Sequence, residues 1–354
     1  MLNAVQGTLV HKGLRYINKM GNLRSELLRE LESRGPGGLR QNEIYSALNY
    51  SRSHVSETLA SLERGGIILR KREGKASKRV WLTEQYPGHI EGLVRVGILM
   101  SSEYVPFLSS IWKSMEGKNQ KIKVRVFGSA PDLISSLHEY TLEIGVAPTF
   151  THVLFSLTNK KEVIISAVGS GGSAVLSNSA VNNNLLATSE SSTMALMSRE
   201  LVKEKGAKIH FFTDPGKAKD EFLAGSFEYM AIWEPFLSDA RNHPGIEEVS
   251  DSGEKSFLNP CCSIGVSRNF LESEGELVRV ISRGYHEFLE KMGEPDLDYG
   301  IGVISDATGY NPEELLESLK SYEFSDRLDL AMLRKYMIDV GIPVSSERLK
   351  EMLL

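Results

Sequence analysis

Hydroxyl residues and glycines follow several predicted strands in the second part of the chain. Their types suit the binding of a small polar molecule, because glycine lets backbone N–H groups approach a ligand closely. In open α/β sheets, ligands bind just beyond the carboxyl ends of the strands. We therefore expect a pocket lined by Ser101, Ser102, Thr149, Ser170, Gly171, Gly172 and Ser173. Each serine has an alternative role as a helix cap or turn residue, and the glycines as a tight turn.

A second group of candidates lies between residues 189 and 236. Ser191, Ser192 and Thr193 open a predicted helix, where free N–H groups favour an anion or a carbonyl oxygen. The apolar run 229–233 reads as a buried strand of a parallel sheet that Pro235 ends. Trp233 would offer an aromatic face to a ligand or pack at a hinge, and Glu234 would receive an amine or fix the adjacent turn.

Neither catalysis nor metal binding is predicted. His138, His152 and His210 are isolated, with no second ligand at metal spacing, and we find no nucleophile paired with a base. The two cysteines, Cys261 and Cys262, are adjacent, which excludes a disulfide framework. We expect them to pack in a strand, with binding of a soft metal or oxidation as the alternative. No catalytic residue, metal or cofactor is therefore expected.

Charge is divided unequally along the 354 residues, a length that accommodates two or three domains. Residues 1–90 carry 15 Lys and Arg against 8 Asp and Glu, a net charge of +7, whereas the remainder carries −12. A polyanion would therefore meet only the first quarter. The sequence shows no signal-peptide pattern and no apolar run that could span a bilayer, so we expect a cytoplasmic protein without membrane contact.

The first quarter predicts a winged helix-turn-helix that binds double-stranded DNA. Helices are expected at 3–20, 22–34, 39–48 and from Ser51 to about 64, followed by strands at 67–70 and 79–83 that flank a basic loop. A polar helix start would read the major groove, while the cations of the loop would contact phosphates. The expected DNA contacts are Arg40, Gln41, Ser51, Arg52, Ser53, His54, Ser56, Arg70, Lys71, Arg72, Lys75, Lys78 and Arg79. The alternative is a basic hairpin on a protein-interaction module.

From Leu93 the pattern changes to alternating strands and helices, which predicts an α/β domain. The polar segment 84–92 is the expected linker, so the domains are predicted at 1–88 and 89–354. A second polar tract at 177–184 predicts a crossing between two lobes. Lobe 1 would comprise about 93–178 and 263–354, and lobe 2 about 183–262.

Two resemblances accompany these predictions. The motifs at 41–44, 51–67 and 80–83 resemble MarR-type and related archaeal winged-helix regulators. The motifs at 142–146, 168–176, 223–236, 309–314 and 322–329 together resemble the type II periplasmic-binding-protein fold, within it the group that binds nitrate, sulfonates and the pyrimidine precursor of thiamine. The expected fold is thus a winged helix-turn-helix domain followed by a two-lobed solute-binding domain.

The combination implies a ligand-responsive transcription regulator that acts as a homodimer, with helix 3–20 as the dimer element. Its small-molecule effector would be a thiamine precursor or a small anion. The absence of Arg and Lys from the expected pocket segments weakens the sulfonate interpretation. Two alternatives remain open: an enzyme of thiamine-pyrimidine synthesis, whose cysteine-rich motif is missing here, and the solute-binding component of a transporter.

Overall fold

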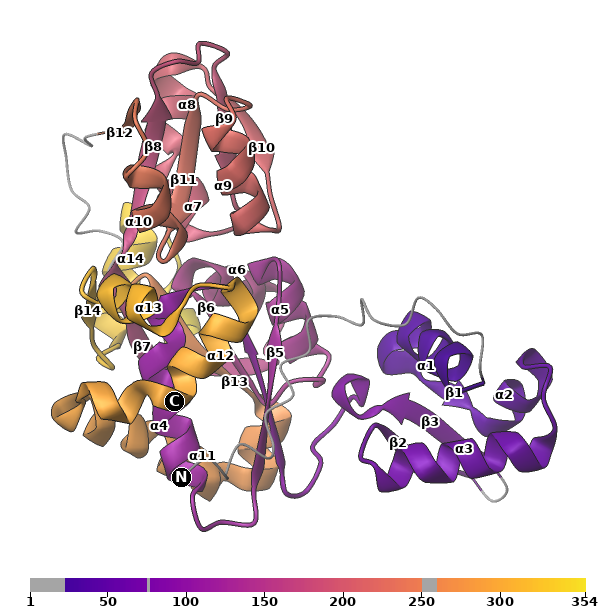
Figure 1. The fold of residues 1–354 in the computed structure, drawn as a ribbon. Coiled ribbons are helices and arrows are strands. Elements are labelled where there is room, and N and C mark those ends of the chain that lie inside the picture. The colour runs from indigo at the N-terminus through magenta and orange to yellow at the C-terminus, as the bar shows by residue number, and fades with distance from the viewer. Residues whose placement is uncertain (1–22, 75–76, 250–259) are drawn as a thin grey trace.

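The computed structural model describes residues 23–74, 77–249 and 260–354. Its chain forms an N-terminal domain and two α/β lobes, joined in that order (Figure 1). The expected helix at 3–20 and the expected DNA contact Lys75 lie outside the described residues. No helix within the described ranges is long and apolar enough to cross a membrane.

The N-terminal domain packs three helices against a small antiparallel sheet with the strand order β1-β3-β2. Its elements are α1 (Leu23–Arg34), η1 (Gly35–Gly37), β1 (Leu39–Arg40), α2 (Gln41–Ala47), α3 (Arg52–Arg64), β2 (Ile68–Glu73), β3 (Ser77–Leu82) and η2 (Thr83–Gln85). The leucine stripe of α1 is buried, as its spacing predicts. Ser51 caps α3 by accepting a hydrogen bond from the His54 N–H. A helix was expected at 39–48, but Leu39 and Arg40 form strand β1 and pair with β3, so helix α2 begins at Gln41.

Lobe 1 is built on a six-stranded mixed sheet with the order β14-β7-β13-β6-β4-β5. Its strands are β4 (Leu93–Ile98), β5 (Lys121–Val126), β6 (Ile144–Pro148), β7 (Glu162–Gly171), β13 (Cys262–Ser267) and β14 (Tyr322–Phe324). Its helices are η3 (Ser102–Tyr104), α4 (Val105–Met115), α5 (Ala130–His138), α6 (Thr149–Thr158), α11 (Arg268–Lys291), η5 (Glu294–Leu297), α12 (Asp298–Thr308) and α13 (Pro312–Leu319). A continuous apolar core joins the sheet to these helices.

Lobe 2 is a five-stranded sheet with the order β10-β9-β11-β8-β12. Its elements are β8 (Ser173–Asn178), β9 (Leu185–Thr188), α7 (Thr193–Met197), α8 (Arg199–Lys205), β10 (Lys208–Phe211), α9 (Pro215–Leu223), β11 (Tyr229–Trp233), α10 (Phe236–Arg241) and β12 (Ile246–Glu248). Strand β11 is buried as expected, but only its β9 side is parallel; it pairs with β8 antiparallel. The expectation of a parallel sheet around this strand is therefore only half right.

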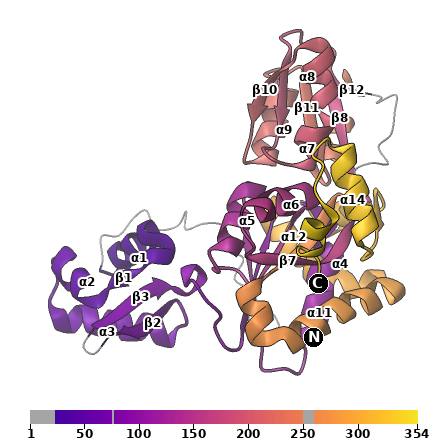
Figure 2. The ribbon, with the colours of Figure 1, turned by 180° about the vertical axis from the view of Figure 1, so that it is seen from behind.

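The C-terminal helices α14 (Leu330–Asp339) and α15 (Ser346–Lys350) pack beside both lobes (Figure 2). Their apolar cluster includes residues of α6 in lobe 1 and Leu196 of α7 in lobe 2. Arg199 of α8 also donates a hydrogen bond to the Val340 carbonyl at 2.6 Å. The end of the chain thus contributes to holding the two lobes together.

The chain crosses from lobe 1 to lobe 2 at Gly172, earlier than the sequence suggested. Strand β7 ends at Gly171 in the sheet of lobe 1, and β8 begins at Ser173 in the sheet of lobe 2. The expected crossing at 177–184 is therefore corrected. Gly171 and Gly172 have φ angles of +88° and +60°, a region that favours glycine, so the chain can turn here between two extended strands.

The linker between the N-terminal domain and lobe 1 is bound by one buried side chain. The Arg95 guanidinium donates to the carbonyls of Thr83, Tyr86 and Gly88 at 3.3, 2.7 and 2.7 Å. It also pairs with Glu143 at 2.7 Å, and both residues are 1% exposed. This ion pair fixes the segment that the sequence treats as a linker against the first strands of lobe 1.

Candidate functional site

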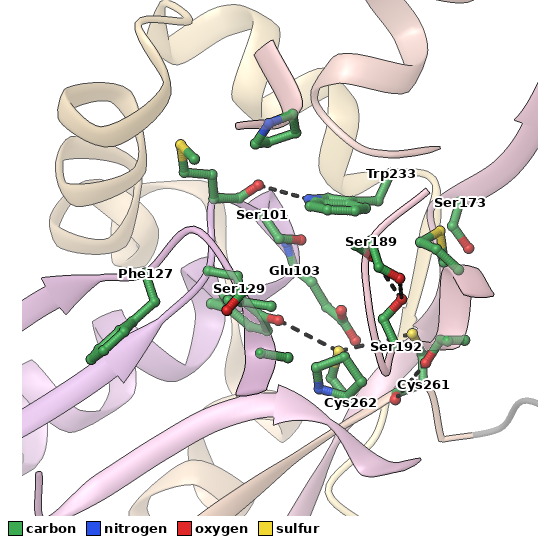
Figure 3. Close-up of a pocket in the computed structure, with 18 of the residues that line it drawn as sticks. Ser101, Glu103, Phe127, Ser129, Ser173, Ser189, Ser192, Trp233, Cys261 and Cys262 are labelled. Carbon is green, nitrogen blue, oxygen red and sulfur yellow. Dashed lines mark hydrogen bonds between the residues drawn. The ribbon is translucent and has the colours of Figure 1, made fainter. Parts of the chain in front are cut away.

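A cavity lies at the junction of the two lobes, beyond the ends of β4, β6 and β11 (Figure 3). Lobe 1 provides one wall and lobe 2 the other, as the sheet-edge argument predicts. The lining residues are Leu99, Met100, Ser101, Glu103, Tyr104, Phe127, Gly128, Ser129, Ala130, Pro148, Gly171, Ser173, Ser189, Ser192, Thr193, Met194, Pro215, Trp233, Cys261, Cys262 and Tyr322. Among these described residues there is no lysine or arginine.

Trp233 lines the cavity and also joins the lobes. Its indole Nε1 donates to the Met100 carbonyl of lobe 1 at 2.7 Å (Figure 3). On its other side the indole lies 5.9 Å from the ring of Phe212. Its place in the cavity wall and its bond across the lobes are compatible with both roles considered from the sequence, a ligand-facing ring and a hinge-packing residue.

The helix that starts after Ser192 presents two of the predicted residues to the cavity. Ser192 caps α7 by accepting from the Ala195 N–H at 3.3 Å, and its hydroxyl donates to the Ser189 carbonyl at 2.7 Å. Thr193 lies beside it and donates to the Cys261 carbonyl at 3.4 Å. The structural role of Ser192 as a cap thus accompanies its place on the cavity wall.

Half of the predicted pocket residues lie in the cavity wall and half do not. Those in the wall are Ser101, Gly171, Ser173, Ser192, Thr193 and Trp233. Those outside it are Ser102, Thr149, Ser170, Gly172, Ser191 and Glu234. Some residues of the second group are engaged elsewhere in the fold. Ser170 pairs with Glu323 of β14, and the Ser102 hydroxyl accepts a hydrogen bond from Ser318.

Glu234 fixes the turn beside the cavity. It is fully buried, and its carboxylate accepts from the Ser238 N–H at 3.0 Å and from the Ser321 hydroxyl at 3.2 Å. Its backbone is also bonded to the crossing between the lobes, because its N–H donates to the Gly172 carbonyl at 2.8 Å. Of the two alternatives left open by the sequence, the geometry matches the turn-fixing one.

The structure adds lining residues that the sequence patterns missed. They are chiefly Glu103, Phe127, Ser129, Tyr322 and the cysteine pair. Glu103 follows the predicted Ser101 and Ser102 directly, so its position after the first strand was an available signal. Phe127 and Ser129 follow the second strand in the same way. Tyr322 comes from the distant strand β14, and only the tertiary fold brings it here.

Glu103 is the ionisable acid of the cavity wall. It is 4% exposed, and its Oε1 has no hydrogen-bond partner within the described parts of the chain. Burial raises its pKa well above the ordinary value, and the nearby Cys261 raises it further. Burial likewise raises the pKa of the Cys262 thiol, whereas a hydrogen bond from Cys262 lowers that of Cys261.

In the N-terminal domain, several residues expected to contact DNA are engaged internally. Arg40 and Arg79 both pair with Glu73, at 3.0 and 2.8 Å, and Arg70 pairs with Glu63. The hydrogen bonds from Arg79 and Arg40 hold the pKa of the Glu73 carboxyl below its usual range.

Most of the remaining expected contacts are exposed, and several also bond to other side chains of the same domain. The Ser51 and Ser53 hydroxyls bond each other at 3.1 Å, and His54 donates its N–H to the Ser51 cap. Tyr45 contacts three more of them, the side chains of Gln41, Arg52 and Ser56. Lys71 lies over the Tyr86 ring, and Lys71, Arg72 and Lys78 are all exposed. Among the hairpin's expected contacts, Arg70 and Arg79 are paired within the domain.

No protein-family model matches the sequence, and no curated protein does. Solved structures do match its fold. The alkanesulfonate-binding protein SsuA from Xanthomonas axonopodis pv. citri bound to MOPS superposes with a TM-score of 0.59 and 16% identity, over 75% of this chain and 99% of that chain. A ligand-binding component of an ABC-type import system from Staphylococcus aureus, with zinc bound, gives 0.57 and 12% identity, over 74% and 99%. The periplasmic nitrate-binding protein NrtA from Synechocystis PCC 6803 gives 0.54 and 9%, over 73% and 88%.

The two lobes therefore have a periplasmic-binding-protein-like fold of the kind found in nitrate- and sulfonate-binding proteins. The prediction of a mixed α/β, two-lobed domain of this type is confirmed. The matched structures are solute-binding proteins, so the prediction of a DNA-binding transcription regulator is contradicted and is corrected here. Among the expected DNA contacts, Arg40, Arg70 and Arg79 are paired with glutamates of the same domain.

Proposed function

We propose that this chain binds a small solute between its two lobes and serves as the solute-binding component of a transporter. The main support is the cavity at the lobe junction, which is lined by residues of both lobes and crossed by the Trp233–Met100 hydrogen bond. We propose binding and not catalysis, because the matched structures are named for the ligands that they bind. The names of the matched structures support the transport role.

The charges of the cavity favour a neutral or positively charged solute over a bare anion. No Lys or Arg lies in the described wall, and Glu103 is buried there. A sulfonate or nitrate would have to rely on hydroxyls and backbone N–H groups alone, close to a carboxyl group. A solute with N–H donors would instead supply the missing partner of Glu103 Oε1.

The lobes must separate for an organic solute to enter. The cavity has a free volume of about 40 Å³, on a measure by which one buried water needs about 10–15 Å³. That is room for a few waters. Gly172 is the crossing point between the lobes, and Trp233 bonds across them, so these two positions would carry the hinge and the closure.

The test is a thermal-shift screen of the full chain with uncharged, cationic and anionic solutes. A solute at 100 times its Kd should stabilise the folded chain by about 2.7 kcal/mol. A Ser173→Tyr variant should block the cavity and abolish that stabilisation. Ser177→Tyr, on the same strand but outside the cavity wall, is the matched control and should keep it.

Two results would oppose the proposal. One is that no solute class stabilises the wild-type chain. The other is that Ser173→Tyr and Ser177→Tyr respond equally to the solute, because binding would then lie elsewhere. Stabilisation by nitrate or a sulfonate in preference to amines would leave the binding role intact and refute the charge argument.

We infer that the N-terminal domain is a winged helix, with α3 as its third helix and β2–β3 as its wing. The support is the order of three helices and an antiparallel hairpin over one apolar core. Hydrogen exchange on the full chain tests this fold: the amides that pair β2 with β3 should be protected. Rapid exchange across both strands would contradict it.

A further inference from the structure

Three side chains with metal-ligating atoms meet at the cavity wall. Glu103, Cys261 and Cys262 each offer one such atom, and these atoms lie within 4.8 Å of one another. The two Sγ atoms are 3.8 Å apart, and both thiols are free and buried. Figure 3 shows the sulfurs beside the Glu103 carboxyl group on the same side of the cavity.

The backbone explains why neighbouring cysteines point to one place. Successive side chains of a regular strand point to opposite faces. Cys261, however, precedes β13, and the pairing of β13 with β7 shifts register immediately after Cys262. The Cys261 main chain is held on both sides, since its N–H donates to the Gly169 carbonyl and its carbonyl accepts from the Thr149 N–H, each at 2.9 Å.

Glu103 provides the second, independent observation. It is 4% exposed, and its Oε1 lacks a partner among the residues that the structure describes. A buried polar group without a partner costs free energy that a bound cation would offset. The cysteines alone could be a packed pair, and the Cys262 thiol also hydrogen-bonds to the Glu103 carboxyl group, but Oε1 of that group still lacks a partner among the described residues.

We propose that Glu103, Cys261 and Cys262 bind one thiophilic divalent cation of the zinc type. Two Zn–S bonds of about 2.3 Å at a tetrahedral angle place the sulfurs about 3.8 Å apart, which matches the observed separation. A carboxylate as third ligand suits zinc better than Cu(I), which prefers soft ligands throughout. Because all three residues line the cavity, a water or a donor atom of a solute would supply the fourth ligand.

Binding exchanges protons for metal bonds, with no redox step. Each thiol loses its proton to the solvent as one metal–sulfur bond forms, and Glu103 loses its proton if it carries one. This inference rests on the proposed function, which says what would occupy the fourth ligand position. The cation is then either the transported solute itself or the anchor that holds it.

The experiment uses the full chain, reduced and freed of metal with a chelator. Zn(II) is titrated against a chromophoric competitor, and Co(II) is used as a spectroscopic probe. One Zn(II) should bind per chain, and Co(II) should give a thiolate-to-metal charge-transfer band. Cys261→Ser and Cys262→Ser should each weaken Zn(II) binding by at least about 100-fold, more than the 10–100-fold typical of an outer-shell change. Glu103→Gln should weaken it while keeping the charge-transfer band.

Ser263→Ala is the matched control, because Ser263 is buried on the same strand but lies outside the cavity wall. It should bind Zn(II) like the wild type. Thermal unfolding without metal shows which cysteine variants still fold, and the Co(II) band of the wild type tests thiolate ligation independently of them. Sub-stoichiometric Zn(II), no charge-transfer band, or equal affinity in Cys261→Ser and Ser263→Ala would overturn the proposal. A disulfide between the two cysteines that survives reductant would also overturn it.

The solute screen, repeated on metal-free protein, separates the two proposals. If organic solutes bind and Zn(II) does not, the metal site is wrong and the solute-binding function stands. If Zn(II) binds through the two cysteines and no organic solute binds, the metal site stands and the cation is itself the solute. If neither binds, both proposals fail.

Discussion

Removing one partner of the buried ion pair between Arg95 and Glu143 should strongly destabilise lobe 1. Glu143 accepts from the Arg95 N–H at 2.7 Å, from Nε at 2.9 Å and from Nη2 at 2.7 Å. Both side chains are 2% exposed. Glu143→Gln removes the compensating charge and leaves a buried guanidinium, a change that costs about 3–5 kcal/mol. Because 1.4 kcal/mol is a factor of ten, protection of the β4 and β6 amides should fall by roughly two to three and a half orders of magnitude.

Hydrogen exchange followed by mass spectrometry measures this loss within lobe 1 alone. The matched control is Glu63→Gln in the N-terminal domain. Glu63 also pairs with an arginine, Arg70, but its side chain is 38% exposed, so the change should cost at most about 1 kcal/mol. Equal losses of protection in the two variants, each read in its own domain, would refute the argument that burial decides the strength of these pairs.

Three further predictions concern single positions. Gly172→Ala should destabilise the chain more than Gly66→Ala. Both glycines have positive φ, +60° and +67°, and the backbone strain common to both is about 1–3 kcal/mol. Of the two, Gly172 is the one where a Cβ would meet another group, the Tyr322 ring at 2.2 Å, so equal urea midpoints would contradict the predicted clash with Tyr322. Burial alone would raise the pKa of Glu162, but His152 and His138 hold it at about 2. Because this pKa lies below the unfolded value near 4.5, the ionised carboxylate stabilises the fold above pH 4.5, and about 3 kcal/mol of stability should be lost as the pH falls from 4.5 to 2. A urea titration at each pH measures this, and an unchanged pH slope in Glu162→Gln would show that another group is responsible. Trp233→Phe removes the indole hydrogen bond across the lobes and should cost about 0.5–1.5 kcal/mol, checked by urea unfolding; no loss would mean that the bond does not persist in solution.

The sequence by itself predicted most of the elements and six of the 21 residues that line the cavity. The capped helix α3, the hairpin β2–β3 and the buried strand β11 follow from local signals: an N-cap, a basic loop and an apolar run ended by a proline. Ser101 and Trp233 were found because Trp233 ends β11 and Ser101 lies shortly after β4, and the carboxyl ends of strands are where pockets form. Such local rules need no knowledge of which segments meet.

The prediction of DNA binding relied on the positive charge of the N-terminal hairpin, and the sequence does not show which of these charges are paired in the fold. Arg40 and Arg79 add to the positive charge of the hairpin in the sequence, yet both pair with Glu73 in the fold. The crossing between the lobes was misplaced for a related reason. The strands β7 and β8 are almost continuous in sequence, and only their pairing with different sheets shows that Gly172 divides them.

What the sequence determined, then, is the order of strands and helices, because backbone propensity, capping and apolar spacing act over a few residues. Only the tertiary structure decided which polar groups share one cavity. Glu103 and the cysteine pair lie about 160 residues apart in the chain, and nothing in their spacing relates them. Sheet pairing of β13 beside β6 and β7 brings them together, and burial then leaves one carboxyl oxygen of Glu103 without a partner. Long-range pairing and desolvation are properties of the folded chain, which is why this site could not be found from the sequence.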